Sequence, residues 1–301
     1  SMNASRTHIR YSRGDRAVLC INFIFLTLFM IVILYPLLYV VAASVTGGSA
    51  TPHLWLIPDH ITFASYKALL GYGELWTGFA NSFLYMILGT VIALLVTVCC
   101  AYPLSVTDFK GSRLLMPMCM ITMYFSGGLV PTYLTMKELH LINTVWAVTL
   151  PGAMSISNMI VMRTYFRSQI PGELRESAEL DGCGNIRYLV SIVLPLSGAI
   201  LAVIGMYYAV GIWNAYFDAM IYLKKRNLYP LTLFIREILI TNNSTAMDQM
   251  TADLSMGAEL EARRNLMKYA VIIVSTLPMM VIYPFVQKYF VKGVMIGAIK
   301  G

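Results

Sequence analysis

Six stretches of this chain stay apolar for about 20 residues, the length that an α-helix needs to cross the hydrocarbon of a bilayer. The sequence therefore predicts an all-α, polytopic membrane protein with six transmembrane helices, at residues 17–43, 78–105, 114–136, 144–162, 192–216 and 268–291.

Composition supports a membrane protein over the other class that a basic chain suggests. Hydrophobic residues make up 58% of the sequence and charged residues 12%, which leaves too little polar surface for a soluble domain. The formal net charge of +7 is compatible with nucleic-acid binding, but the cations form no basic face with interleaved aromatic residues. A membrane protein needs cationic loops to set its orientation. We therefore expect contact with membrane lipid and none with nucleic acid.

The cysteines and histidines form no metal or redox pattern. Most of the five cysteines lie inside apolar runs, and none has the spacing of a zinc knuckle or a redox pair. The four histidines are scattered over the N-terminal segment and loops, and no His-Glu-x-x-His sequence is present. We predict no metal site, and we expect the cysteines to be small buried apolar side chains.

Prolines inside the apolar runs predict kinks and not helix ends. Neighbouring helices and hydroxyl groups can satisfy the carbonyl oxygens that a proline leaves unpaired in a membrane helix. The prolines concerned are Pro36, Pro103, Pro131, Pro151 and Pro278.

Basic residues in the short flanks predict the orientation, because cytoplasmic loops carry an excess of Lys and Arg. Six spans place both termini on one side, together with most of these cations, so we expect both termini in the cytoplasm. The predicted divisions are a cytoplasmic segment at 1–16, a transmembrane domain at 17–291 and a cytoplasmic tail at 292–301. The flanking cations on this side are Arg6, Arg10, Arg13, Arg16, Lys110, Arg113, Arg163, Arg167, Arg175, Arg187, Lys288, Lys292 and Lys300.

A charged elbow at 169–195 interrupts the apolar sequence on the predicted cytoplasmic side. Pro171 can serve as a first helical residue, Gly182 can close the helix in a left-handed cap, and Asn185 can cap a second short helix. We expect Leu174 and Ala178 to pack at i and i+4. The charges expected at the surface are Glu176, Glu179 and Asp181. A solvated loop whose charges only keep it out of lipid is the alternative.

The spacing within this elbow resembles the EAA motif of permeases in the ATP-binding-cassette importers. That motif reads Glu-Ala-Ala, three residues, Gly, nine residues, and Ile-x-Leu-Pro. Ser177 replaces the second-position alanine and is small enough to keep the packing. The matching positions are Glu176, Ala178, Gly182, Ile192, Leu194 and Pro195.

The resemblance implies a mechanism and a set of partners. The elbow would be a coupling helix that docks in a cleft of a separate ATPase subunit. The chain has no phosphate-binding Gly-x-x-x-x-Gly-Lys-Ser/Thr loop, so it is expected to be a transport subunit and not an enzyme. ATP and Mg²⁺ would bind two partner ATPase subunits and no cofactor would bind this chain. The implied coupling residues are Glu176, Ser177, Ala178, Asp181, Gly182, Ile192 and Pro195.

Further stretches resemble the second permease subunit of maltose-type carbohydrate importers, which reside in bacterial plasma membranes. They are Asn81-Ser82-Phe83, the 127–131 run Gly-Gly-Leu-Val-Pro, Trp213-Asn214 and the tail from Gln287. The residues of the 127–131 run and of the tail are similar to those of the branch that serves acidic oligosaccharides such as pectin fragments, aldouronates and alginate. The resemblance implies a second homologous permease, an extracytoplasmic solute-binding protein and an oligosaccharide substrate. Its implied ATPase-contacting tail residues are Gly297, Ala298, Lys300 and Gly301.

Two regions are candidates for the substrate and the binding protein. The aromatic and amide residues that suit sugar recognition are Tyr207, Tyr208, Trp213 and Asn214, although Trp and Tyr also belong at membrane interfaces. The long loop at 217–266 is either an ordinary surface loop or a contact with the binding protein, through Asn242, Asn243 and Asp248. The cations of this loop either attract an acidic sugar, or orient the chain or dock an acidic binding protein. They are Lys224, Lys225, Arg226, Arg263 and Arg264.

A stripe of small residues in the fifth predicted span allows two interpretations. It favours close helix packing in lipid, or a moving interface along the pathway. Its members are Gly198, Ala202, Gly205 and Ala209.

Two other functions remain as alternatives to an importer permease. An ion-gradient-driven secondary transporter usually carries charged groups within its spans, whereas the centres of these six are nearly free of them. A membrane-embedded hydrolase needs a nucleophile and a base at a supportive spacing, and none is visible. The sequence leaves open the identity, length and charge of the sugar, and which permease holds the main sugar site.

Overall fold

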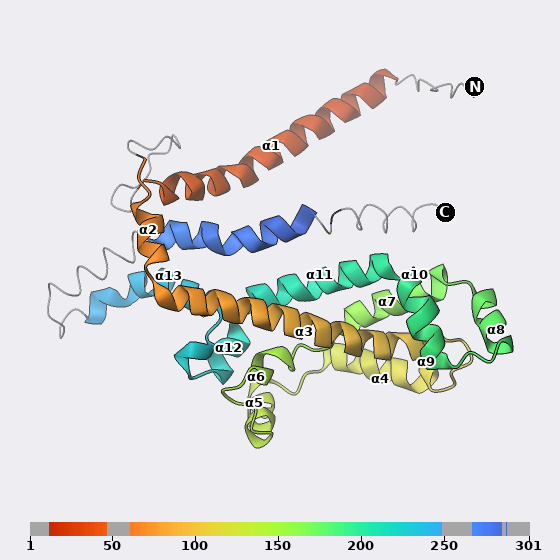
Figure 1. The fold of residues 1–301 in the computed structure, drawn as a ribbon. Helices are drawn as coiled ribbons and strands as arrows, with labels where there is room; N and C mark the ends of the chain where they lie inside the picture. The colour runs from red at the N-terminus through yellow and green to blue at the C-terminus, as the bar shows by residue number, and fades with distance from the viewer. Residues whose placement is uncertain (1–11, 47–60, 249–266, 285–286, 288–301) are drawn as a thin grey trace. The chain divides into compact units, whose positions relative to one another are not determined.

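The computed structural model describes residues 12–46, 61–248, 267–284 and 287, and within them the secondary structure is helical. The chain divides into two compact units, one made of Ser1–Leu69 and Asp248–Ile273, the other of Leu70–Met247 and Val274–Gly301. The helix Met267–Pro284 contributes residues to both. Figure 1 shows the fold.

The smaller unit contains the long helix α1 (Arg13–Ser44) and α2 (Ala64–Leu70), whose last residue belongs to the other unit. A capping box begins α1, because the Ser12 Oγ accepts the Asp15 amide and the Asp15 carboxylate accepts the Ser12 amide. The Ser44 and Tyr66 hydroxyls bond at 2.8 Å. These contacts fix both ends of a helix whose 18-residue apolar window has no buried residue, as expected for a lipid-facing span.

The larger unit is built around α3 (Gly73–Ser105), which packs along α7 (Ile156–Gln169) and α11 (Gly198–Asn214). A fourth helix, α4 (Ser112–Tyr124), runs beside them (Figure 1). The core between them is apolar, and members from the three packed helices are Ala93, Ala101, Met159, Met162, Ile200 and Ile204. The close approach of α11 to α3 depends on a member of the small-residue stripe, because a Cβ on Gly205 would lie 3.3 Å from Leu94. This contact supports the packing interpretation of that stripe.

Short helices gather at the two ends of this unit (Figure 1). One end carries the elbow, with α8 (Gly172–Leu180), α9 (Asn185–Tyr188), a π-helical turn (Leu189–Val193) and α10 (Leu194–Leu196). The remaining elements are α5 (Leu129–Glu138), α6 (Trp146–Thr149), α12 (Phe217–Tyr222), the 3-10 turn η2 (Arg226–Leu228) and α13 (Leu231–Asp248).

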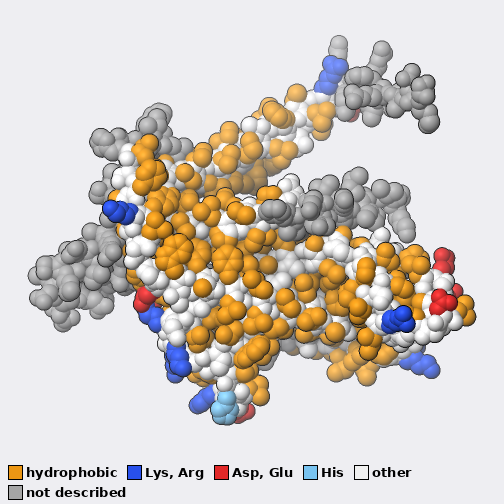
Figure 2. Space-filling view, viewed as in Figure 1, with side chains coloured by type: hydrophobic (Ala, Val, Ile, Leu, Met, Phe, Trp, Pro, Cys, Tyr) orange, Lys and Arg blue, Asp and Glu red, His pale blue; other side chains and the backbone are white. Residues whose placement is uncertain are grey.

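Charge and apolar surface separate along the larger unit. On the face drawn in Figure 2, its charged side chains lie near the elbow at one end and near α5 at the other, with hydrophobic side chains between. On α4 every residue is at least partly exposed, and its large apolar side chains include Leu114 at 69%, Met118 at 54% and Ile121 at 57%. An apolar band between two charged ends is the surface that a bilayer requires.

Within the described residues, three continuous helices are long and apolar enough to span a membrane: Gly14–Ser44, Gly73–Ser105 and Met267–Pro284. They match the first, second and sixth predicted spans. Two bent pairs raise the number to five if each pair is one span. Ser112–Tyr124 and Leu129–Glu138 are bent by 112°, and Asn185–Leu196 and Gly198–Asn214 by 84°. The structure therefore does not confirm six continuous spans.

The predicted helix at 144–162 is wrong in its bounds. The chain forms α6, turns at Leu150–Ser155, and begins α7 only at Ile156, where the Ser155 Oγ accepts the Asn158 amide at 3.4 Å. Helix α7 then continues to Gln169 through polar residues. Hydropathy marks where the chain is apolar, whereas the Pro-Gly pair after Leu150 and the Ser155 cap decide where the helix begins.

Three of the five prolines lie inside helices as predicted, and the predicted kinks stay a prediction. Pro36 and Pro103 lie inside α1 and α3, and Pro278 lies inside Met267–Pro284. Pro131 is instead the third residue of α5, and Pro151 lies in the turn between α6 and α7. At these two sites the proline accompanies a helix boundary, because it lacks the amide that a helix interior needs.

Candidate functional site

Helix α8 of the elbow ends in the left-handed cap that the sequence predicts. Gly182 has φ of +74°, its amide donates to the Glu179 carbonyl at 3.0 Å, and the Cys183 amide donates to the Ala178 carbonyl at 2.8 Å. This pair of bonds is a Schellman motif, which favours glycine because a Cβ is strained at that φ. At the other ends, Pro171 is the N-cap of α8 and Asn185 is the first residue of α9, one position away from each predicted role.

The outward face of the elbow is charged and also carries large apolar side chains. Glu176, Glu179 and Asp181 are exposed as predicted, and Glu179 accepts a hydrogen bond from Arg175 Nε at 2.8 Å. Leu180 is 89% exposed and Ile186 is 81% exposed. The sequence reasoning missed these two residues, although leucine and isoleucine in a charged loop are a detectable signal. Large apolar side chains so exposed favour a protein contact.

The inward face of α8 is narrow. Ala178 is 8% exposed and belongs to the core of the unit, and Ile192 is partly buried against that core. Leu174, predicted to pack beside Ala178, is 40% exposed. Ser177, the departure from the EAA motif, is exposed and its hydroxyl donates to the Glu173 carbonyl at 2.8 Å. The residue that differs from the motif, Ser177, therefore lies on the solvent side of α8. Pro195, another motif position, is exposed as well.

Two polar contacts tie α7 and the elbow to α3. Arg163 Nε donates to the Leu104 carbonyl at 2.7 Å, at the carboxyl end of α3, where the helix dipole favours a cation. The Tyr102 hydroxyl donates to the Asn185 carbonyl at 3.4 Å. The carboxyl end of α3 is thus bonded to α7 through Arg163 and to α9 through the Asn185 carbonyl.

Tyr208, a predicted sugar contact, lies in the core. It is 6% exposed, its hydroxyl lies 2.7 Å from the Thr97 Oγ1, and the same oxygen accepts the Ser155 amide at 3.0 Å. These bonds join α11, α3 and the start of α7. In this structure Tyr208 therefore stabilises helix packing.

The other three predicted substrate residues differ in exposure. Trp213 is 4% exposed, its ring centre lies 5.0 Å from that of Phe83, and its Nε1 donates to the Ser275 carbonyl at 3.3 Å. Tyr207 is 49% exposed, and the exposed Asn214 donates to the carbonyl one turn earlier at 2.8 Å. The four residues therefore do not converge on one surface, and their substrate role stays a prediction.

At the end opposite the elbow, α3 holds the 227–231 segment through side chains. Asn81 Nδ2 donates to two carbonyl oxygens of this segment at 2.8 and 3.0 Å, and Ser82 Oγ accepts its last amide at 2.9 Å. The Tyr85 hydroxyl donates to a third carbonyl at 2.7 Å. An irregular segment is thereby fixed to a long helix before α13 begins.

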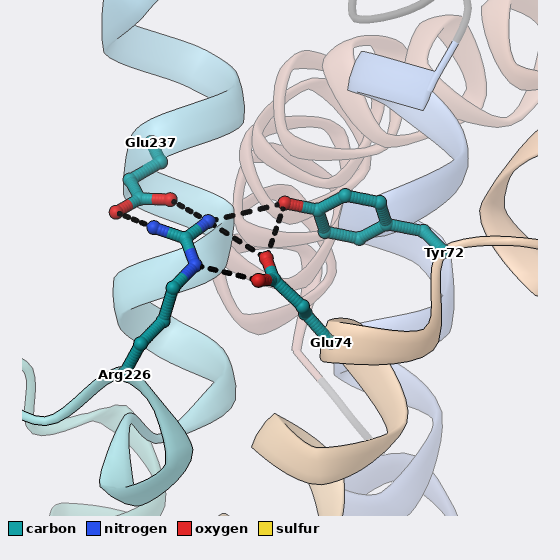
Figure 3. Close-up of polar contacts among 4 residues, drawn as sticks. All are labelled: Tyr72, Glu74, Arg226 and Glu237. Carbon is teal, nitrogen blue, oxygen red and sulfur yellow. Dashed lines mark hydrogen bonds and ion pairs between the residues drawn. The ribbon is translucent and has the colours of Figure 1, made fainter.

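Arg226 strengthens the same junction (Figure 3). Its Nε and Nη2 donate to the two carboxylate oxygens of Glu74 at 2.8 and 2.7 Å, and its Nη1 and Nη2 donate to those of Glu237 at 3.2 and 3.0 Å. The Tyr72 hydroxyl donates to Glu74 at 2.9 Å. The hydrogen bonds to Glu74 raise the pKa of Arg226 further above its usual range. One guanidinium thus joins η2, α3 and α13.

This pairing changes the interpretation of the predicted cationic cluster. Arg226 is neutralised by two carboxylates, whereas Lys224 and Lys225 are exposed and belong to no ion pair within the described part of the chain. Two further members lie outside the described residues, Arg263 and Arg264. The two lysines are therefore the better candidates for attracting an anion.

Comparison with known proteins decides what kind of molecule carries this elbow. No family model matches the sequence. Protein LplC of Bacillus subtilis (strain 168) is 36% identical over 93% of this chain and 94% of its own length. The polygalacturonan/rhamnogalacturonan transport system permease protein YtcP of the same strain is 34% identical over 92% of this chain and 96% of its own length. The chain belongs to the permease subunits of carbohydrate ATP-binding-cassette importers.

A solved structure extends this likeness to the fold. A chain from the crystal structure of a bacterial ABC transporter involved in the import of the acidic polysaccharide alginate superposes on the permease with a TM-score of 0.82. The two are 31% identical, over 93% of the permease and 99% of that chain. The permease is therefore an all-helical membrane transport subunit with the importer permease fold, and it is not an enzyme. Its family implies ATPase, solute-binding and second-permease partners.

The geometry also explains two of the stretches that resemble this family. Asn81 and Ser82 hold the 227–231 segment, while Phe83 packs on Trp213. Both stretches thus form the junction at the amino end of α3. Neither hydropathy nor spacing identifies their partners, because those partners lie more than a hundred residues away along the chain.

Several predicted contacts of the permease are not described by the structure. The backbone of α13 extends to Asp248, but the side chains of Asn242, Asn243 and Asp248 lie outside the described residues. The tail residues lie outside them too: Gly297, Ala298, Lys300 and Gly301. Among the residues that are described, no group of three or more His, Cys, Asp or Glu side chains could hold a metal ion.

Proposed function

We propose that the permease forms half of the translocation pathway for an oligosaccharide and pairs with a second, homologous permease as a heterodimer. Two ATPase subunits bind its cytoplasmic face and carry the ATP and Mg²⁺, and no cofactor binds this chain. An extracytoplasmic solute-binding protein delivers the sugar to the opposite face. The comparisons do not favour the alternative of an ion-gradient-driven transporter.

The charge distribution supports the proposed orientation. The termini, the segments 1–16 and 292–301 and the elbow at 169–195 are cytoplasmic, since these parts carry most of the short-flank cations. The loop at 217–266 is then extracytoplasmic, where Asn242, Asn243 and Asp248 contact the binding protein. The tail from Gly297 lies against the ATPases.

The observation that carries the proposed coupling is the composition of the elbow surface. Helix α8 exposes Glu176 and Leu180 to solvent while only Ala178 is buried. A helix that makes few contacts with its own unit and exposes both charged and apolar side chains is suited to docking in a cleft of another protein. Motion of an ATPase that grips this helix would reach α3 through Tyr102 and α7 through its connection to α8.

The break between α4 and α5 supports a position for the pathway. Helix α4 has 13 residues, which advance about 20 Å from the proposed cytoplasmic side, so the break at 125–128 lies at membrane depth. Gly128 has φ of +87°, and the amides of Ser126, Gly127 and Gly128 have no acceptor within the described part of the chain. Irregular backbone with unpaired amides is tolerated at this depth only against protein or water. We infer that 125–128 faces the pathway or the second permease.

Labelling of an introduced cysteine tests this position. In a background without native cysteines, Ser126→Cys in the assembled transporter should react with a water-soluble thiol reagent at least about tenfold faster than Val32→Cys in α1. A thiol in hydrocarbon stays protonated and unreactive, whereas one in a water-filled pathway forms thiolate. Rates as slow as that of Val32→Cys would contradict a water-filled pathway at 125–128. The native cysteines to replace are Cys20, Cys99, Cys100, Cys119 and Cys183.

We propose further that the oligosaccharide is acidic, as in alginate- or pectin-like fragments. Support comes from relatives named for polygalacturonan and for the acidic polysaccharide alginate. Lys224 and Lys225 place two exposed cations on the proposed outer face. Exposed charges act over about 8 Å at physiological ionic strength, so their attraction is modest and depends on salt.

Uptake by the reconstituted transporter, with its binding protein, tests the substrate class. We expect uptake and stimulated ATP hydrolysis with uronate oligosaccharides and little with neutral ones. Replacing both Lys224 and Lys225 with serine should slow uronate uptake about threefold at low salt and less at high salt, because steering by exposed charge is screened. Lys110→Ser, an exposed lysine at the other end of α3, is the control. Equal uptake of neutral and acidic sugars would reject an acidic substrate.

A further inference from the structure

A small cavity lies beneath the elbow, where the carboxyl ends of α3 and α7 meet the start of α8. Its volume is about 140 Å³, which is several times the space that one water molecule needs. Apolar residues form part of the wall. The polar and charged residues of the lining are Tyr102, Ser105, Thr107, Arg167, Arg175 and Tyr188.

The Tyr188 hydroxyl is the unusual group of this cavity. Tyr188 is 5% exposed, and its hydroxyl oxygen is buried without a hydrogen-bond partner among the described residues. Burial raises the pKa of Tyr188, and the positive charge of Arg175 offsets only part of that rise. The hydroxyl therefore keeps its proton and is a donor. A buried donor without an acceptor is unfavourable, and it calls for a bound acceptor.

The rest of the lining favours an anion as that acceptor. Arg175 uses Nε to bind Glu179, and no other bond of its guanidinium is recorded in the described part of the chain. Arg167 forms no ion pair with any described residue. The amino end of α8, a helix of nine residues, reaches the same cavity at Gly172, and helix amino ends attract anions. Among the described residues, no carboxylate lines this cavity.

Of the two arginines in the lining, Arg175 is paired with a carboxylate, so the positive charge of the lining comes from Arg167. Glu179 is already paired with Arg175, and the side chain of Glu173 in the first turn of α8 is exposed. Asp108 lines a second cavity of about 350 Å³, which shares Arg175 and Tyr102 with the first. The cavity beneath the elbow is thus lined by two guanidinium groups and by hydroxyl groups.

We propose that this cavity binds a phosphate group, either free or as the headgroup of an anionic phospholipid, through Arg167, Arg175 and the Tyr188 hydroxyl. The lipid source rests on the proposed function, which places the elbow at the cytoplasmic surface of the membrane. Val190 in the elbow and Leu196 directly after it are 57% and 55% exposed and offer apolar surface for acyl chains. A bound phosphate would fix the start of α8 relative to α3 and α7.

The test measures lipid and phosphate binding by the assembled transporter. The complex is placed in phosphatidylcholine nanodiscs with increasing phosphatidylglycerol or with inorganic phosphate, and retained ligand is measured by native mass spectrometry. Tyr188→Phe and Arg167→Gln should each weaken binding about tenfold, the effect of losing one charge-assisted hydrogen bond. Arg187→Gln, which removes an exposed arginine of α9 outside the cavity, should bind as wild type does.

The arms of this experiment separate the outcomes. Retention of phosphatidylglycerol alone identifies a lipid site, and retention of inorganic phosphate identifies a free-anion site. Wild-type binding by Tyr188→Phe and Arg167→Gln, or an equal loss in Arg187→Gln, would overturn the inference. Tyr188→Phe removes a hydroxyl that has no partner among the described residues, so a purely structural tyrosine predicts unchanged or higher stability and unchanged binding. The readout is binding, so its failure is distinct from a failure of the proposed transport function.

Discussion

Leu180→Asp is expected to uncouple the permease from its ATPase while leaving its fold intact. Leu180 is 89% exposed at the end of α8, so its replacement removes little contact with the described part of the permease. If α8 docks in an ATPase cleft, burial of this leucine contributes about 1.5–3 kcal/mol to the contact. A buried aspartate adds a desolvation penalty. We expect ATPase association to weaken at least about tenfold and transport to fall by a similar factor.

Two measurements check this result. Pull-down of the ATPase by the solubilised permease reports association, and binding-protein-stimulated ATP hydrolysis in proteoliposomes reports coupling. Leu139→Asp is the matched control, because Leu139 is 61% exposed after α5 and far along the unit from the elbow (Figure 1). Wild-type association and stimulation in Leu180→Asp would mean that the exposed elbow is only a solvated loop.

Gly78→Val is expected to damage the opposite end of the permease. A Cβ at Gly78 would lie 2.7 Å from the Phe234 ring and 3.2 Å from the Leu231 Cα. Each of those residues is 1% exposed, so neither has room to move. Overpacking of this kind costs about 1–3 kcal/mol, and relief requires α13 to separate from α3.

The functional consequence follows from the proposed position of this end. If the loop at 217–266 contacts the binding protein, Gly78→Val should lower binding-protein-stimulated ATP hydrolysis several-fold and basal hydrolysis much less. Gly211→Val is the control, since it introduces the same side chain into α11 where a Cβ meets nothing within 4 Å. Thermal unfolding of both variants separates a local displacement from a global defect. Undiminished stimulation in Gly78→Val would argue against a role for this junction.

Local chemistry made the elbow predictable. Pro171 and Gly182 fix the ends of α8 through the φ angles and amides of a few neighbouring residues, and these effects act over about one helical turn. The exposure of Glu176 and the burial of Ala178 follow from helical periodicity. By contrast, Leu174 satisfies the same periodicity and is exposed, because only one narrow face of α8 contacts the core.

Hydropathy could not place the breaks. The runs at 114–136 and 192–216 are apolar throughout, but the chain bends by 112° after Tyr124 and by 84° at Ser197. The apolarity of a segment indicates whether it prefers lipid or water, but it does not indicate where the helix axis changes direction. Gly128 permits the first bend through its positive φ, and whether the chain uses that freedom depends on what lies against it.

By itself, the sequence determined that this protein is an all-helical membrane permease with a charged elbow closed at Gly182, because hydropathy, capping and motif spacing are properties of residues close together in the chain. Only the tertiary structure decided which side chains are available for contact. It buries Tyr208 between Thr97 and the start of α7, and it pairs Arg226 with Glu74 and Glu237. It also leaves the Tyr188 hydroxyl without a protein partner among the described residues. These outcomes depend on contacts between helices that are distant in sequence. A polar group in a low-dielectric interior must bond to a group that tertiary packing places beside it.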